Sequence, residues 1–161
     1  KHYDFNFGQE YTLKVGAGES DEGWFGALAL GGPGASTYEN NLANGYSEII
    51  KVGDIINIET GNISNPTKRA IDERIMECTH SPYCTAECFS RDCRRLIKLP
   101  IINIEDARKV RVIGFAVFLV NEVEGQGVDN YIKGEFIKTV MSGEIDSNLL
   151  DYGLIGVKLI H

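Results

Sequence analysis

The chain has 161 residues, enough for one domain with a sizeable core, and its 43% hydrophobic and 24% charged residues are ordinary for a globular domain. Its net charge of −7 argues against nucleic acid or an anionic membrane as the main partner, because both require a basic surface. No apolar run approaches the roughly 18 residues of a membrane-spanning helix.

Short apolar runs separated by glycine-rich turns predict many strands. Several runs alternate apolar and polar residues, as strands with one buried face do. The run 112–120 is apolar on both faces, which predicts a central strand, and Gly114 suggests a bulge or a bend there. The predicted strands are 11–15, 24–30, 47–52, 54–59, 96–105, 109–123, 130–140 and 154–160. The last two are expected to form a C-terminal hairpin with Gly143 in the turn, while Tyr131, Phe136 and Tyr152 pack the core or cover a sheet edge.

Two short helices interrupt the strands. In "GASTYENNLANGY", Ser36 and Glu39 have the spacing of a capping box, and Gly45 stands where a C-terminal cap is needed. In the second, Asn65 is the expected N-cap and Pro66 the first helical residue, and the helix is expected to end near Cys78. Residues 1–161 are therefore predicted to form one mainly β domain. We expect about eight strands in a barrel or sandwich, two short α-helices and a cysteine-rich loop.

The segment "VGDIINIETGNISNPTKRAIDERI" (52–75) turns from a strand into a helix, and it is a candidate for a phosphate-binding loop, a catalytic elbow or a structural corner. It lacks the second glycine of a P-loop, and Pro66 removes a backbone N–H that such a loop would need. A serine nucleophile at Ser64 would need a lysine at position 67, which is threonine. We interpret the segment as a structural corner.

All four cysteines lie within 16 residues, at Cys78, Cys84, Cys88 and Cys93. Their spacing is not that of paired zinc knuckles, and sequence cannot choose among the three possible disulfide pairings. We expect two disulfides. A zinc site that uses these cysteines together with His80, or free thiols, are the alternatives.

Other candidate sites are weaker. The acidic run "GESDEG" (18–23) could bind calcium, but it is more typical of a solvated loop. Glu59 with Asp54 or Asp72 could serve as paired carboxylates of a hydrolase, although Asp54 is better explained as a turn residue. No convergent acid, base and nucleophile is evident, so we expect no catalytic residues and no cofactor. Exposure of Trp24 in a groove would instead favour a carbohydrate- or ligand-binding module.

Several segments resemble the extracytoplasmic C-terminal part of bacterial TadE/TadG-like proteins, which are associated with Flp pilus assembly. They include "FGALALGGPGASTYENNLANGY", "VGDIINIETGNISNPTKRAIDERI", "VRVIGFAVFLVNEV" and "DYGLIGVKLI", so that the resemblance covers about 24–160. It implies a non-enzymatic domain on the bacterial cell surface, joined to the membrane by an N-terminal anchor that would precede Lys1. It also implies contacts with other pilus or envelope proteins, leaves self-association open, and places the cysteines where disulfides persist.

Overall fold

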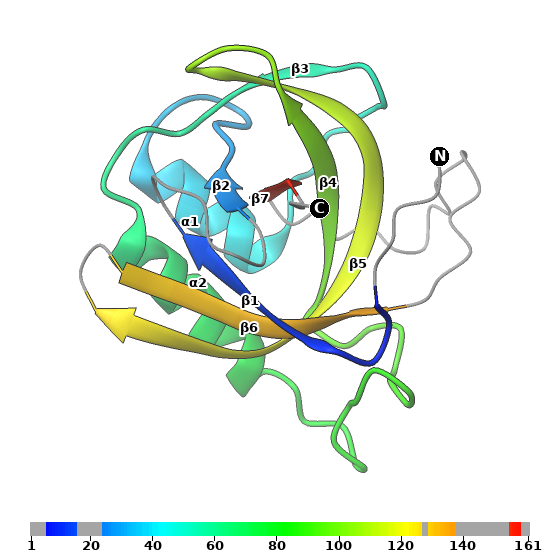
Figure 1. Cartoon of the computed structure of the whole chain (residues 1–161). Coiled ribbons are helices and arrows are strands. Elements are labelled where there is room, and N and C mark those ends of the chain that lie inside the picture. Colours follow the sequence, from blue (N-terminus) through cyan, green and yellow to red (C-terminus); the bar gives the residue numbers. More distant parts are fainter. Residues whose placement is uncertain (1–5, 16–23, 127–128, 138–154, 159–161) are drawn as a thin grey trace.

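The computed structural model describes residues 6–15, 24–126, 129–137 and 155–158. In this part of the chain a mixed sheet packs against a pair of helices (Figure 1). The strands are β1 (Glu10–Val15), β2 (Trp24–Ala27), β3 (Ile55–Asn57), β4 (Leu96–Ile104), β5 (Lys109–Gln126), β6 (Asp129–Ile137) and β7 (Ile155–Lys158). The helices are α1 (Ala35–Asn44) and α2 (Ser64–Met76).

The sheet has the order β3-β5-β4-β7-β2-β1-β6, and β5 also pairs with β6. Its pairs are antiparallel except β1–β2 and β4–β7. The prediction of a strand-rich domain with two short helices is confirmed, but the predicted barrel or sandwich is corrected to one strongly curled, open sheet. Within the described residues β4 and β7 share a single pair, Ile101–Val157, so the sheet is least well joined between these two strands. At the other side of β5, β3 is an edge strand.

The long strand β5 organises the sheet, because it pairs with β3, β4 and β6. Its apolar run is buried from Ala116 to Val120, as expected for a central strand. The register against β4 shifts between Ile101 and Ile102, which leaves Ile113 as an extra residue beside Gly114. The predicted bulge at Gly114 is therefore confirmed.

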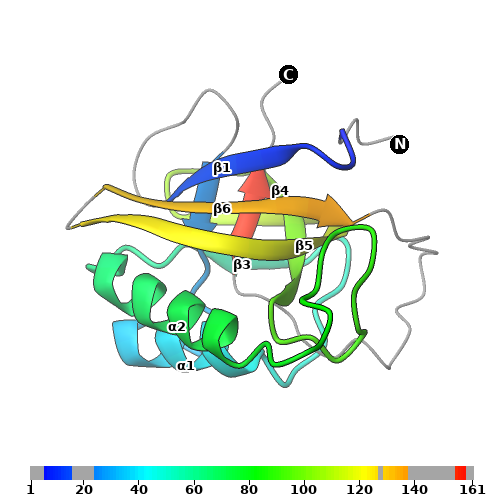
Figure 2. The ribbon, with the colours of Figure 1, turned by 90° about the horizontal axis from the view of Figure 1, so that it is seen from below.

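The two helices lie side by side on one face of the sheet (Figure 2). Apolar residues from both helices join those of β1, β4, β5 and β6 in one core cluster, which includes Leu42, Ile71, Leu99 and Phe118. Phe136 is buried at the centre of this cluster and meets Phe118 edge to face, with ring centroids 4.9 Å apart. The core role predicted for Phe136 is thereby confirmed.

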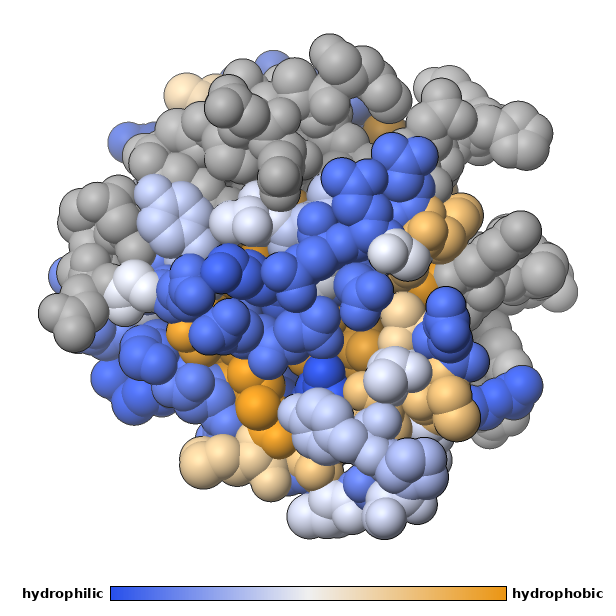
Figure 3. All heavy atoms as spheres, turned by 60° about the horizontal axis from the view of Figure 1, so that its bottom comes forward, coloured by the Kyte–Doolittle hydropathy of each residue, from blue (hydrophilic) through white to orange (hydrophobic). Residues whose placement is uncertain are grey.

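The outer face of β1, β5 and β6 is polar. Lys133 of β6 pairs with two glutamates of β5, with its Nζ atom 2.9 Å from Oε1 of Glu124 and 3.9 Å from Oε2 of Glu122. Figure 3 shows the polar residues that gather across this side of the molecule. In β1, β6 and the polar part of β5, buried and polar side chains alternate, as in strands with one face in the core and one in water. Residues 96–102 of β4 and 116–120 of β5 are instead buried on both faces.

Two predicted strand arrangements are wrong. Residues 47–52 form a loop that leads into a turn. In this turn the Asp54 N–H donates to the Lys51 carbonyl over 3.1 Å. The C-terminal hairpin is also absent from the described pairings: β6 lies between β1 and β5, and β7 lies between β2 and β4. Gly143 and Tyr152 lie outside the described residues.

The helix caps differ from the prediction at both N-termini. Gly34 precedes α1 with no side-chain cap, and Glu39 pairs with Arg69 of α2 instead of forming a capping box with Ser36. Helix α2 begins at Ser64, one residue before the predicted cap Asn65. Gly45 does end α1, at a φ of 87° that favours glycine, and its N–H donates to the Asn41 carbonyl.

Within the described residues, neither helix has the length and apolar character required to cross a membrane.

Candidate metal centre

Residues 77–95 form a loop between α2 and β4, seen at the bottom of Figure 1. Glu77 ends α2, with its N–H bonded to the Glu73 carbonyl, so Cys78 is the first residue after the helix. At the other end, the Leu96 N–H donates to the Cys93 carbonyl over 3.0 Å as β4 begins. Both ends of the loop are therefore held by regular structure, which places Cys78 and Cys93 side by side.

Four side chains of this loop converge on one point: Cys78, His80, Cys84 and Cys93. Their potential ligand atoms all lie within 4.8 Å of one another, with 3.4 Å between the sulfurs of Cys78 and Cys93 and 3.8 Å between Cys78 Sγ and His80 Nδ1. Two sulfurs bound tetrahedrally at about 2.3 Å from a zinc ion would lie about 3.8 Å apart. The cluster thus has nearly the dimensions of a tetrahedral Cys₃His site.

The three converging cysteines are buried, whereas Cys88 is exposed. Cys88 belongs to a local turn in which its N–H donates to Oγ1 of Thr85 over 3.1 Å, and it is not part of the cluster. All four thiols are unpaired in the structure, and the two predicted disulfides stay a prediction. Of the five residues considered for zinc, the structure brings together Cys78, His80, Cys84 and Cys93 but not Cys88.

A carboxylate orients the histidine of the cluster. The Nδ1 atom of His80 faces Cys78, and Nε2 lies 3.1 Å from Oδ1 of Asp92. Asp92 is itself held by the hydroxyl of Ser90. A ligating histidine commonly uses its second ring nitrogen in this way, because the carboxylate selects the tautomer and makes the ligand more basic.

The surroundings of Cys78 favour its thiolate. Burial alone raises the pKa of the Cys78 thiol, but hydrogen bonds from His80, Cys93, the Cys84 backbone and Arg95 outweigh it and lower the pKa to about 6. Burial raises the pKa of the neighbouring Cys93 to about 12, so Cys93 keeps its proton and donates a hydrogen bond to the sulfur of Cys78. The hydrogen bond to Cys78 is the main cause of the raised pKa of His80. The site therefore already carries thiolate character, which metal binding requires.

Arg95 joins the loop to the sheet. This buried guanidinium donates to the Val120 carbonyl of β5, to the Cys84 carbonyl of the loop and to Oδ1 of Asn121, each over 2.8 Å. The exposed Tyr83 ring lies against it, 4.2 Å from the guanidinium carbon. Arg95 is not among the residues predicted from the sequence, although a basic residue directly before the apolar run of β4 was a usable signal.

The described carboxylates of the other candidate sites have structural partners. Asp54 accepts the Lys51 N–H over 2.8 Å, as expected of a turn residue, and Asp72 pairs with Lys68 over 2.7 Å. Glu59 accepts backbone N–H groups of Gly34 and Gly61. Its carboxylate therefore occupies the N-terminus of α1, which supports the structural interpretation of the 52–75 corner.

Some candidate residues lie outside the part of the chain that the structure describes. The acidic run 18–23, considered for calcium, is among them. Trp24 belongs to β2, but its side chain is outside the described residues as well.

Comparison of the chain with protein-family models, with curated proteins and with solved structures gave no match. The resemblance to TadE/TadG-like proteins accordingly stays a prediction from the sequence.

Proposed function

We propose that Cys78, His80, Cys84 and Cys93 bind one zinc ion, and that the chain is a zinc-stabilised, non-enzymatic binding domain. The observation that carries this proposal is the convergence of four ligand atoms within 4.8 Å. Three sulfurs and an imidazole nitrogen form a set that suits zinc, whereas calcium and magnesium require oxygen ligands.

The ligand number favours a structural role for the ion. Catalytic zinc sites keep a coordination position open for water or substrate, while structural sites are closed by four protein ligands. Cys78, Cys84 and Cys93 are buried, at 8%, 3% and 3% exposure, so the sulfurs have little contact with solvent. An ion held there would fix the loop between α2 and β4 and leave no position for a reacting molecule.

Contacts with other proteins remain part of this proposal, as does anchoring at a bacterial cell surface. The support for both is the sequence resemblance to TadE/TadG-like proteins over about 24–160. The redox state of the compartment bears on the site, because an oxidising environment would favour disulfides among the same cysteines. Zinc and disulfides are therefore alternative states of one loop.

The test is to count zinc and reactive thiols on the same sample. The chain is produced in a reducing compartment without a metal-binding tag, and zinc is measured by elemental analysis while a thiol reagent is applied under native conditions. We expect one zinc per chain and rapid labelling of Cys88 alone, with the other three thiols labelled only after chelation. Absence of zinc, or equal labelling of all four thiols, would contradict the proposal.

One observation favours a second candidate, a cysteine nucleophile. Cys78, His80 and Asp92 follow one another at 3.8 Å and 3.1 Å, in the order of a nucleophile, a base and an orienting carboxylate. The burial of Cys78 and the sulfur of Cys93 at 3.4 Å argue against it. Under this alternative, an electrophilic probe would label Cys78 faster than Cys88 in the metal-free protein, and it would do so only while His80 is present.

A further inference from the structure

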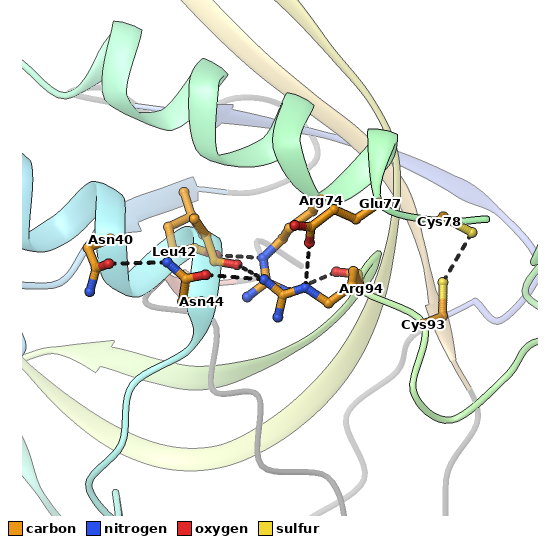
Figure 4. A network of polar contacts seen from close by, with 9 residues as sticks. Asn40, Leu42, Asn44, Arg74, Glu77, Cys78, Cys93 and Arg94 are labelled. Atoms are coloured by element: carbon orange, nitrogen blue, oxygen red, sulfur yellow. Dashed lines mark hydrogen bonds and ion pairs between the residues drawn. The ribbon is translucent and has the colours of Figure 1, made fainter. Parts of the chain in front are cut away.

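The residue that follows Cys93 reaches the end of α1. Arg94 donates from Nη2 to the Ala43 carbonyl over 2.5 Å and to Oδ1 of Asn44 over 3.5 Å (Figure 4). Its Nε atom lies 2.7 Å from Oε2 of Glu77, the residue that precedes Cys78. One side chain thus connects the last turn of α1 with both ends of the cysteine loop.

A second arginine completes this connection from α2. Arg74 is fully buried and donates from Nε to the Leu42 carbonyl over 2.5 Å. Its Nη1 atom donates to the backbone carbonyl of Arg94 over 2.8 Å, so the position of the Arg94 backbone is also fixed from α2 (Figure 4).

These contacts supply what the end of a helix lacks. The last four carbonyls of an α-helix have no partner within the helix, and positive charge is favourable at that end. In α1 the Asn41 carbonyl accepts the Gly45 N–H, the Leu42 carbonyl accepts from Arg74, and the Ala43 carbonyl accepts from Arg94. Of the two side-chain partners, one is Arg94 itself, and the other, Arg74, also donates to the Arg94 carbonyl.

The position of the Arg94 backbone depends in turn on the cysteine cluster. Cys93 is directly bonded to Arg94, and Cys78 directly follows Glu77, the carboxylate partner of Arg94. We propose that metal binding by the cysteine cluster orders the last turn of α1 through Arg94, so that metal occupancy and the packing of α1 are coupled. This inference rests on the proposed zinc site. It adds that the ion orders a helix that is far from the loop in sequence. Such coupling is reciprocal, so a well-packed α1 would in turn strengthen metal binding.

The chain offers a matched control in Arg69. Arg69 also joins the two helices, with its guanidinium 2.6 Å from Oε2 of Glu39, but it has no contact with the cysteine loop in the described structure. Arg94→Gln and Arg69→Gln change the charge equally, and each removes the guanidinium that pairs with a glutamate, Glu77 or Glu39. Only the first removes a link between the loop and α1.

The experiment measures residue-resolved amide hydrogen exchange by NMR on the full chain, with zinc counted in each sample. In zinc-loaded Arg94→Gln we expect about tenfold faster exchange at Ala43, Asn44 and Gly45 than in the unchanged chain, as for a local opening that becomes easier. Arg69→Gln is expected to leave these three amides unchanged. Glu77→Gln, which removes only the carboxylate partner of Arg94, should give a smaller increase at the same amides and serves if Arg94→Gln does not fold.

Removal of zinc from the unchanged chain should accelerate exchange at the same three amides. Two results would overturn the coupling while leaving the zinc site intact. The first is unchanged exchange at residues 43–45 in zinc-loaded Arg94→Gln or Glu77→Gln. The second is an equal increase at these amides in Arg69→Gln. A chain that binds no zinc would overturn the proposed function itself, so the two failures are distinguished by the zinc count.

Discussion

The Nε2 atom of His80 lies 3.1 Å from Oδ1 of Asp92, while Nδ1 of the same ring faces the sulfur of Cys78. The ring is thus fixed from both sides. This arrangement distinguishes a ligating histidine from a surface one, because a carboxylate at the second nitrogen leaves the first free to bind a metal.

Asp92→Asn is expected to weaken zinc binding by about 10- to 100-fold, because the neutral amide no longer makes His80 a more basic ligand. Competition with a chromophoric chelator measures the change. Glu87→Gln is the control: it removes a carboxylate from an exposed position of the same loop, and its affinity should equal that of the unchanged chain. Equal effects of the two substitutions would mean that only the net charge of the loop matters.

Cys78→Ser should abolish stoichiometric zinc binding, whereas Cys88→Ser should keep one zinc per chain. The first removes a buried member of the cluster, and the second an exposed thiol outside it. At free zinc about a thousand times the Kd, loss of the ion would cost about 4 kcal/mol of unfolding free energy. Chemical denaturation at defined free zinc tests this. Similar losses in both variants would point to a different ligand set.

Arg95→Gln should lower the free energy of unfolding by about 3 kcal/mol, because the buried Val120 and Cys84 carbonyls would lose their donors. Arg91→Gln, an exposed change in the same loop, should stay within about 0.5 kcal/mol. Urea denaturation of zinc-loaded samples compares the two. If Arg95→Gln were as stable as Arg91→Gln, Arg95 would not hold the loop to the sheet.

Alkaline pH should destabilise the domain through Tyr38. Burial is the main cause that raises the pKa of this hydroxyl above its ordinary value, against the opposing effect of its hydrogen bond to Thr67. Tyr38 is therefore neutral in the folded chain at a pH where the unfolded chain already ionises. The stabilisation that Tyr38 adds to the free energy of unfolding is therefore complete below about pH 10. Above that pH it is lost, by up to about 1.4 kcal/mol per pH unit.

Tyr38→Phe provides the control for this pH dependence. It should cost about 1 kcal/mol at neutral pH, because the hydrogen bond to Thr67 is lost, and it should flatten the decline above about pH 10. Urea denaturation between pH 8 and 11 measures both effects. An unchanged alkaline slope in Tyr38→Phe would assign the destabilisation to other groups.

The sequence predicted the elements whose local pattern matches their environment. The apolar run of β5, the bulge at Gly114 and the cap at Gly45 follow from side-chain burial and glycine conformation, which are local properties. Pairing between distant strands is not local. Nothing in the C-terminal residues indicates that β7 inserts between β2 and β4, and this insertion is why the predicted hairpin failed.

For the candidate site too, the sequence predicted the local pattern but not the contacts between distant residues. The cysteines and His80 were recognisable as a possible metal set, but their irregular spacing gave no reason to exclude Cys88. That distinction depends on the turn between Thr85 and Cys88, which directs one thiol outward while the others face inward. The contribution of Asp92 and Arg95 is likewise visible only in three dimensions, because their partners lie on other turns of the loop and on β5.

X-ray absorption at the zinc edge of the purified chain tests the central claim most directly, because it reports which atoms surround the metal. We predict three sulfur neighbours at about 2.3 Å and one nitrogen neighbour at about 2.0–2.1 Å, with the nitrogen replaced in His80→Ala. Four sulfur neighbours would mean that Cys88 replaces His80. A shell of oxygen and nitrogen alone would contradict the Cys₃His centre altogether.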